Sequence, residues 1–114
     1  MSSKDEKNLQ QVIEKMQKMD EPERALMLRI HEVIMDAAPA LKPRIWYGMP
    51  AYAASASTPA LVTLRNDDRV NLALTEKVEF RPADGTLMPA AWYIETLDAD
   101  TERRIAEIVR SAVG

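Results

Sequence analysis

The chain contains no cysteine and only one histidine among its 114 residues. The absence of cysteine excludes disulfide bonds, thiolate metal sites, iron–sulfur ligation and cysteine nucleophiles. A single histidine likewise excludes a metal site built from several histidines of this chain. A metal ion bound by this chain would therefore need oxygen ligands, chiefly carboxylates.

Long apolar runs are also missing, and so is an excess of basic residues. No run approaches the ~20 apolar residues of a membrane helix, and the charged N-terminus lacks the apolar segment of a signal peptide. The net charge is −3, with 8 basic and 8 acidic side chains in residues 1–60 and 7 and 10 in residues 61–114. Neither half could neutralise a row of phosphates. We therefore expect a cytoplasmic protein that has neither nucleic acid nor a membrane as its partner.

The composition, 46% apolar and 29% charged, is that of one globular domain covering residues 1–114. Apolar residues recur at helical spacing over residues 3–19, 20–38 and 99–113. Asp20 is the expected N-cap of the second helix, with Glu23 reaching back to it, and Asp98 is the expected N-cap of the third.

The middle of the chain changes to the alternating pattern of β-strands. Strand-like segments lie at residues 44–47, 51–53, 60–65, 69–75 and 91–97. Residues 75–90 are broken into turns by prolines and a glycine, and a short helix over residues 76–80 is compatible with this stretch. The order predicts an α+β domain, with two N-terminal helices, an antiparallel β-sheet of about four to six strands, and a C-terminal helix packed on the same face.

The most distinctive string is Ile45-Trp46-Tyr47-Gly48-Met49-Pro50-Ala51-Tyr52. Gly48 permits backbone angles that other residues avoid, and Pro50 removes a strand donor, so we expect a kinked segment at a sheet edge or a bulge. Bulges redirect side chains and are frequent beside functional sites. The aromatic residues then either line a ligand pocket or, as is more common, pack in the core. The ligand-binding hypothesis comprises Trp46, Tyr47, Met49, Pro50 and Tyr52, with Trp92 from a later strand as a neighbour.

The hexapeptide Tyr47-Gly48-Met49-Pro50-Ala51-Tyr52 resembles the YdhG-like family of small bacterial proteins. The similarity runs from about residue 23 to residue 113 and includes the string Asp84-Gly85-Thr86-Leu87-Met88-Pro89 ahead of the last strand. That family is often described as intracellular iron chaperones with a frataxin-like domain. The resemblance implies an α+β sandwich and iron that is bound by surface carboxylates and delivered for iron–sulfur or haem assembly.

Asp20, Glu21 and Glu23 form the densest acidic group near the N-terminus and are the first candidates for binding iron. Four lysines lie among the six acidic residues of the first 23 positions, a mixture typical of a solvated helix face. We therefore expect no tightly bound cofactor, and any iron to be held weakly at this group.

Motifs of catalysis are missing: the chain has no nucleophile elbow, phosphate-binding loop or dinucleotide glycine pattern. His31 lies at the margin of an apolar helix stripe, where a structural role is more common than catalysis. We expect a small cytoplasmic binding module without enzymatic activity. By resemblance it is an iron chaperone, and the alternative is a module that binds a small ligand or a partner protein through the aromatic Gly-Met-Pro kink without metal.

Overall fold

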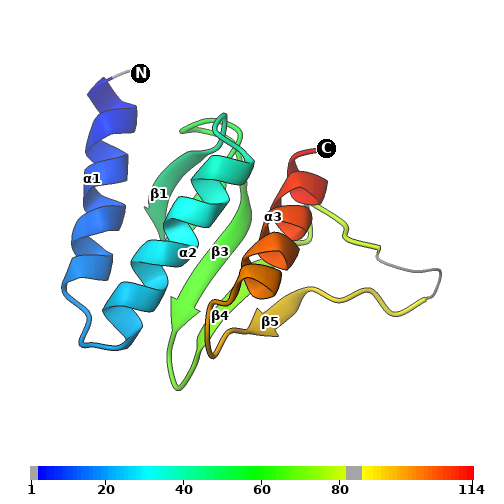
Figure 1. Cartoon of the computed structure of the whole chain (residues 1–114). Coiled ribbons are helices and arrows are strands. Elements are labelled where there is room, and N and C mark those ends of the chain that lie inside the picture. Colours follow the sequence, from blue (N-terminus) through cyan, green and yellow to red (C-terminus); the bar gives the residue numbers. More distant parts are fainter. Residues whose placement is uncertain (1–2, 82–85) are drawn as a thin grey trace.

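The computed structural model describes residues 3–81 and 86–114 of the chain. Helices and strands follow one another in the order α1 (Ser3–Gln17), α2 (Glu23–Ala37), β1 (Lys42–Trp46), β2 (Met49–Ala53), β3 (Ala60–Asn66), β4 (Val70–Leu74), β5 (Ala91–Tyr93) and α3 (Ala99–Val113) (Figure 1). The strands thus occupy the middle of the chain, where the sequence pattern changes from helical to alternating period.

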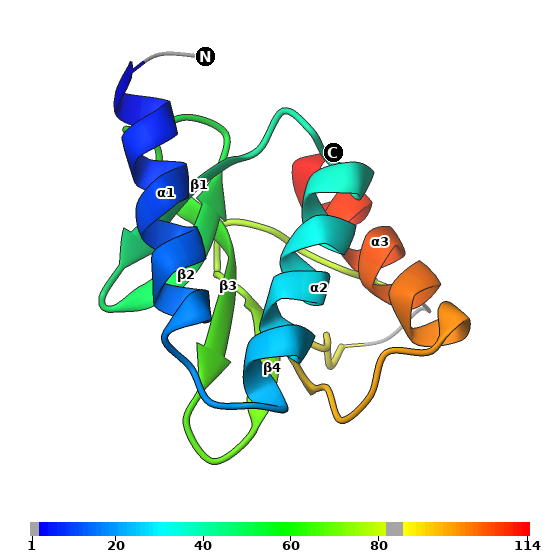
Figure 2. The same cartoon turned by 60° about the vertical axis from the view of Figure 1, so that its left-hand side comes forward.

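The five strands form one antiparallel sheet in which neighbours along the chain are also neighbours in space. All three helices lie on the same face of this sheet, with α2 between α1 and α3 (Figure 2). The predicted α+β class is therefore confirmed, as is the position of the C-terminal helix. The opposite face carries none of the described helices and is called the open face below.

The hydrophobic core lies between the helix layer and the sheet. Strand β4 shows the underlying alternation, because Val70, Leu72 and Leu74 are buried under the helices while Asn71 and Ala73 belong to the open face. The largest fully buried side chains come from both layers: Val12, Met16, Met27, Ile30, Ile34, Pro50, Tyr52, Val62, Leu64, Leu72 and Val109. Burial of this kind stabilises the fold by roughly 1.5–3 kcal/mol for each large apolar side chain.

The helix ends agree with the sequence prediction at α3 and differ from it at α2. Asp98 caps α3, because its Oδ1 accepts a hydrogen bond from a first-turn N–H at 2.7 Å. The expected cap of α2 by Asp20 and Glu23 is wrong, since the helix begins only at Glu23 and its N-cap position is Pro22, which makes no side-chain capping bond. The carboxylate of Glu21 instead accepts a hydrogen bond from the N–H of Ala25 at 2.8 Å. The later start of the helix brings Glu21, rather than Asp20, within reach of the first turn.

Two predicted elements between the sheet and α3 differ from the structure. The strand expected over residues 91–97 ends at Tyr93, after which the chain leads irregularly to α3. Residues 76–80 form a turn and an irregular segment rather than a helix. Asp84 and Gly85, part of the string that resembles the YdhG-like family, lie outside the described residues.

Candidate functional site

Strands β1 and β2 are joined by a two-residue turn, Tyr47-Gly48, which is closed by the pair Trp46 and Met49. Both turn residues have left-handed backbone angles, with φ of 50° at Tyr47 and 76° at Gly48. Such turns match the twist of the flanking strands and usually carry Asn or Asp before Gly, because larger side chains are strained at positive φ. The predicted kink is therefore a tight hairpin turn, and its first residue, Tyr47, has a strained backbone.

Pro50 follows this turn in an inner strand of the sheet rather than at the predicted edge. It lies opposite Ile45 of β1, and the register of β2 with β3 begins only at Ala51. The missing N–H of the proline therefore interrupts no described pairing between β2 and β3. The irregularity of register in β2 lies further along, between Tyr52 and Ala53.

Three of the predicted ligand residues lie together at the turn. Tyr47 is 83% exposed. Trp46 is half-buried, and its ring contacts that of Tyr47 edge to face, with centroids 4.7 Å apart and planes at 71°. Met49 lies opposite Trp46 on the open face. The structure thus brings Trp46, Tyr47 and Met49 together at one end of β1 and β2.

The other three predicted residues are not part of this partly exposed group. Pro50 and Tyr52 are buried on the helix-covered side of the sheet. Trp92 lies in β5, at the opposite edge of the sheet, where its ring packs against Phe80 with centroids 5.8 Å apart. Tyr52 and Trp92 therefore contribute to packing and do not line the surface next to Tyr47.

Tyr52 forms a buried hydrogen bond with His31 of α2, which joins the helix layer to the sheet. Its hydroxyl lies 2.6 Å from Nδ1 of His31, and the ring centroids are 5.7 Å apart. Burial lowers the pKa of His31 and raises the pKa of Tyr52. Both groups are therefore neutral at pH 7, and the hydroxyl donates to Nδ1 when the imidazole carries its proton on Nε2.

A hollow of about 400 Å³ lies beside the turn and is called the turn hollow below. It is lined by Lys15, Met19, Tyr47, Gly48, Met49, Pro50, Leu64, Arg65, Asn66 and Asp67. Arg65 is paired with Asp67 at 2.7 Å, and Asn66 Nδ2 donates to the sulfur of Met19 at 3.8 Å. The ammonium of Lys15 has no ion pair with any described residue, so it can receive an anionic group. Sequence reasoning missed Lys15, Met19 and Arg65 because they come from elements far from the turn in sequence.

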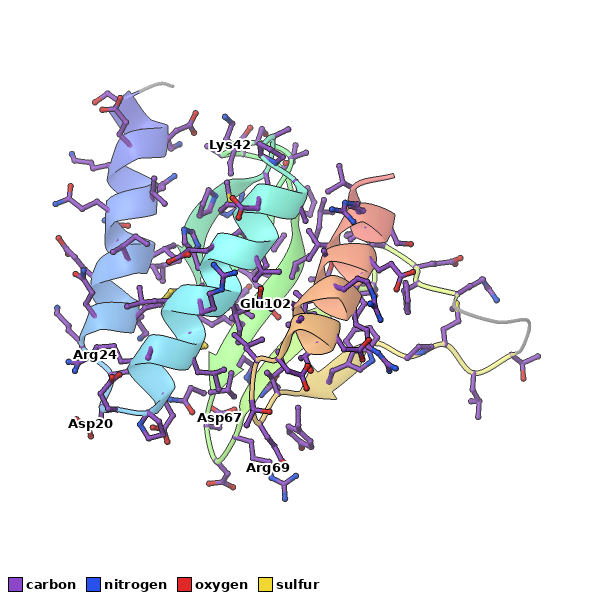
Figure 3. All side chains as sticks on the ribbon, in the orientation of Figure 1. Asp20, Arg24, Lys42, Asp67, Arg69 and Glu102 are labelled. Carbon is purple, nitrogen blue, oxygen red and sulfur yellow. The ribbon has the colours of Figure 1, made fainter. Side chains whose placement is uncertain are left out.

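A larger hollow, of about 570 Å³, lies between the start of α2 and the β3–β4 turn. Both of its arginines already have partners. Arg29 donates to the carboxylates of Glu102 and Glu32 at 2.8 to 2.9 Å, and Arg69 lies over the ring of Tyr93 at 5.0 Å from its centroid. Glu102 and Arg69 are labelled in Figure 3. This hollow therefore offers an apolar lining without a cation that awaits a partner.

The predicted metal residues surround the start of α2. The Glu21 carboxylate already has two partners. It accepts a hydrogen bond from the N–H of Ala25 and forms an ion pair with Arg24, whose Nε lies 3.3 Å away. Within residues 3–81 and 86–114, no group of three or more His, Asp or Glu side chains is placed to hold a metal ion together. The structure therefore does not gather Asp20, Glu21 and Glu23 into a metal-binding arrangement.

Comparison with known proteins finds no match, either to a family model, to a curated protein or to a solved structure. No helix in the described part of the chain combines the length and the apolar character that crossing a membrane requires. The function is therefore inferred from the geometry of the site.

Proposed function

We propose that this chain is a non-enzymatic binding module that recognises a partner protein through the Trp46–Tyr47 pair and the adjoining turn hollow. The observation that supports this proposal is the backbone of Tyr47, a bulky residue that is held at positive φ while its side chain is exposed. Strained backbone that packing does not explain is characteristic of functional sites.

A turn selected for stability alone would carry a different residue at position 47. A residue with a Cβ in the left-handed region costs about 1–2 kcal/mol, whereas Asn or Gly adopts it readily. The edge-to-face contact with Trp46 recovers about 0.5–1.5 kcal/mol of that cost. Little is gained from burial, because most of the Tyr47 side chain faces solvent. We therefore infer that the exposed ring of Tyr47 contacts a partner protein.

The chemistry of the turn hollow suits a side chain of another protein. Met19, Met49 and Leu64 provide an apolar lining, and methionine adapts its shape to different occupants. Tyr and Trp are enriched at protein interfaces, where they contribute most of the binding energy. In the proposed complex, an apolar side chain of the partner enters the turn hollow and packs against Tyr47, while Trp46 supports the tyrosine ring.

Photo-crosslinking tests this proposal because it captures a partner whose identity is still open. A benzophenone amino acid replaces Tyr47 in one variant and the exposed Glu107 of α3 in a matched control. Both are irradiated in extract of the source organism, with an excess of unlabelled chain as competitor. We expect a discrete adduct from position 47 that the unlabelled chain suppresses and that a Tyr47→Asn competitor does not.

Equal adducts from both positions, or equal competition by the two chains, would refute the proposal. The Asn variant is a fair competitor because Asn accepts positive φ, so the hairpin keeps its geometry while the ring is lost. Circular dichroism of this variant verifies that the fold is retained.

A further inference from the structure

The charge of the sheet points to the chemistry of the partner. The five strands contain no Asp or Glu, although the chain as a whole has a net charge of −3. Their only charged residues are Lys42, Arg44 and Arg65. The register places all three on the open face. Arg65 lies opposite Asn71 of that face. Arg44 is linked to it through the pairs with Ala51, Thr63 and Ala73, and Lys42 lies two residues from Arg44 in the same strand. The open face is therefore cationic on an acidic protein.

Two of these cations, Lys42 and Arg44, differ from every other lysine and arginine in the described residues. They are the only ones that are half-buried, whereas all the others are exposed. Neither has a carboxylate within ion-pair distance in the described part of the molecule. A cation that is partly removed from water without a counter-charge lowers stability. Lys42 and Arg44 are called the edge cations below.

Arg44 is held in place by its surroundings without being neutralised. Nη1 of Arg44 donates to the carbonyls of Ser55 and Ala56 at 3.1 and 3.2 Å, which directs the guanidinium across the end of β2. Its remaining N–H groups have no partner among the described side chains. The residues opposite Arg44 and Lys42 are alanines, Ala51 and Ala53, which are too short to provide one. The guanidinium is thus positioned to donate to an external anion.

We infer that the partner binds through an acidic, extended segment that runs along β1 and places its carboxylates on the edge cations. This inference rests on the proposed interface at the turn, with which the edge cations are continuous. Arg44 and Trp46 lie two residues apart on the same face of one strand, about 6.6–6.8 Å along it. An extended peptide matches this spacing when a carboxylate and an apolar side chain are separated by one residue.

A short peptide fits these observations better than a nucleic acid. Of the three cations in the described strands, only Lys42 and Arg44 lack a counter-charge, because Arg65 is already paired with Asp67. Nucleic-acid binding gains most of its affinity from neutralising many phosphates, and the net charge of −3 opposes a long polyanion. Two carboxylates on a short segment are sufficient for the edge cations.

The probe is a short acetylated peptide in which two glutamates and a phenylalanine stand at alternate positions, separated by serines, to match the alternate positions of Lys42, Arg44 and Trp46. Its glutamine counterpart and an oligodeoxythymidine of similar length serve as comparisons. Binding is followed by ¹H–¹⁵N NMR titration of the full chain at two salt concentrations. We expect the glutamate peptide to bind about tenfold more tightly than the glutamine peptide, because hydrogen bonds to charged groups are stronger than those between neutral groups. The shifted amides should include residues 42, 44, 46 and 47.

The variant Lys42→Gln/Arg44→Gln should remove the preference for glutamate and leave the weak binding of the glutamine peptide. Its matched control is Lys77→Gln/Arg110→Gln, which removes the same charge from exposed positions elsewhere and should retain the preference. Because Arg44 also bonds to the loop after β2, Arg44→Lys is a second variant, and it should keep the preference through its charge.

Equal binding of the two peptides, or an equal loss in the control variant, would overturn the inference. Tighter binding of the oligonucleotide than of the glutamate peptide would overturn it in favour of nucleic acid. If only the proposed interface at the turn is wrong, the result differs. The Tyr47→Asn variant would then bind both peptides as tightly as the wild type does, and the glutamate peptide would still bind more tightly than the glutamine peptide.

Discussion

Substitution of Tyr52 by Phe should weaken the fold and leave the turn unchanged. Tyr52 is fully buried, and its hydroxyl is 2.6 Å from Nδ1 of His31, which is itself 8% exposed. Removal of the hydroxyl deletes this hydrogen bond and leaves the imidazole nitrogen without a partner in a buried site. The expected loss in the free energy of unfolding is about 1–3 kcal/mol, since an orphaned buried acceptor adds its desolvation cost to the lost bond.

Urea unfolding at pH 7.5, followed by far-ultraviolet circular dichroism, measures this loss. The midpoint should fall while the m-value is unchanged, because the folded state buries nearly the same surface. A loss below about 0.5 kcal/mol would show that the bond contributes little and would refute the reasoning. The NMR spectrum of Trp46 and Tyr47 should not change, because Tyr52 faces the helices and these residues lie at the turn.

The same pair predicts how stability depends on pH. Burial lowers the pKa of His31 below its ordinary 6.5, although the nearby Glu32 partly opposes this shift. The unfolded chain therefore binds more protons than the folded chain once the pH falls below about 6.5. Stability is fully present above that pH and declines on acidification, by at most about 1.4 kcal/mol per pH unit for one proton.

The ionisation of Tyr52 makes stability fall at alkaline pH, whereas that of His31 makes it fall at acidic pH. Burial raises the pKa of its hydroxyl above the ordinary 10, so the folded chain keeps this proton when the unfolded chain releases it. Stability therefore declines as the pH rises above about 10.

The variant His31→Asn keeps an acceptor near the position of Nδ1 and does not titrate. Its free energy of unfolding should therefore not decline between pH 7 and 5. Identical profiles of this variant and the wild type in that range would contradict the assignment.

Three further outcomes are expected. Tyr47→Asn should be more stable than Tyr47→Ala by about 1 kcal/mol in urea, because both lose the ring and only Asn tolerates the left-handed backbone; equal midpoints would show that the turn is unstrained. The iron chaperone role implied by resemblance requires a metal site. Calorimetric titration with ferrous iron should give only weak, salt-sensitive heat that Asp20→Asn/Glu23→Gln reduces, whereas a stoichiometric site that survives salt would speak for that role. Asp98→Ala should lower the melting temperature and Asp98→Asn should largely preserve it, since Asn also caps a helix. The hydrogen bond from Thr101 also lowers the pKa of Asp98.

The order of elements could be predicted because each segment has a strong period. Helix α3 extends over the predicted residues 99–113, since its apolar stripe is continuous and Asp98 marks its start. The register of β4 likewise follows from the alternation of apolar with other residues in residues 70–74. The end of β5 could not be predicted, because Ile94 and Glu95 continue the alternation of Trp92 and Tyr93 while the chain already leads to α3.

The candidate site was less predictable, because a string of residues does not specify which of them share a face. The aromatic residues around Gly48 are close in sequence, but alternation in β2 turns Tyr52 into the core and leaves Met49 on the open face. A Tyr-Gly pair is also an unusual hairpin turn, so the sequence indicated an interruption where the structure has a tight reversal. Lys15, which comes from α1, enters the turn hollow only through tertiary packing.

The lack of a counter-charge at the edge cations does not arise from a shortage of acidic residues, because the chain has 18 Asp and Glu against 15 Lys and Arg. On the helix layer, Arg29 bridges α2 and α3 through a two-pronged contact with Glu102, which raises the pKa of Arg29 and lowers that of Glu102. The same device would stabilise β1, yet its neighbours opposite Lys42 and Arg44 are alanines. Strand β1 and its turn thus combine two independent departures from what stability alone would select, unpaired half-buried cations and a strained exposed tyrosine. Departures of this kind are expected where a surface serves binding, and their continuity along one strand favours a single site over two unrelated accidents.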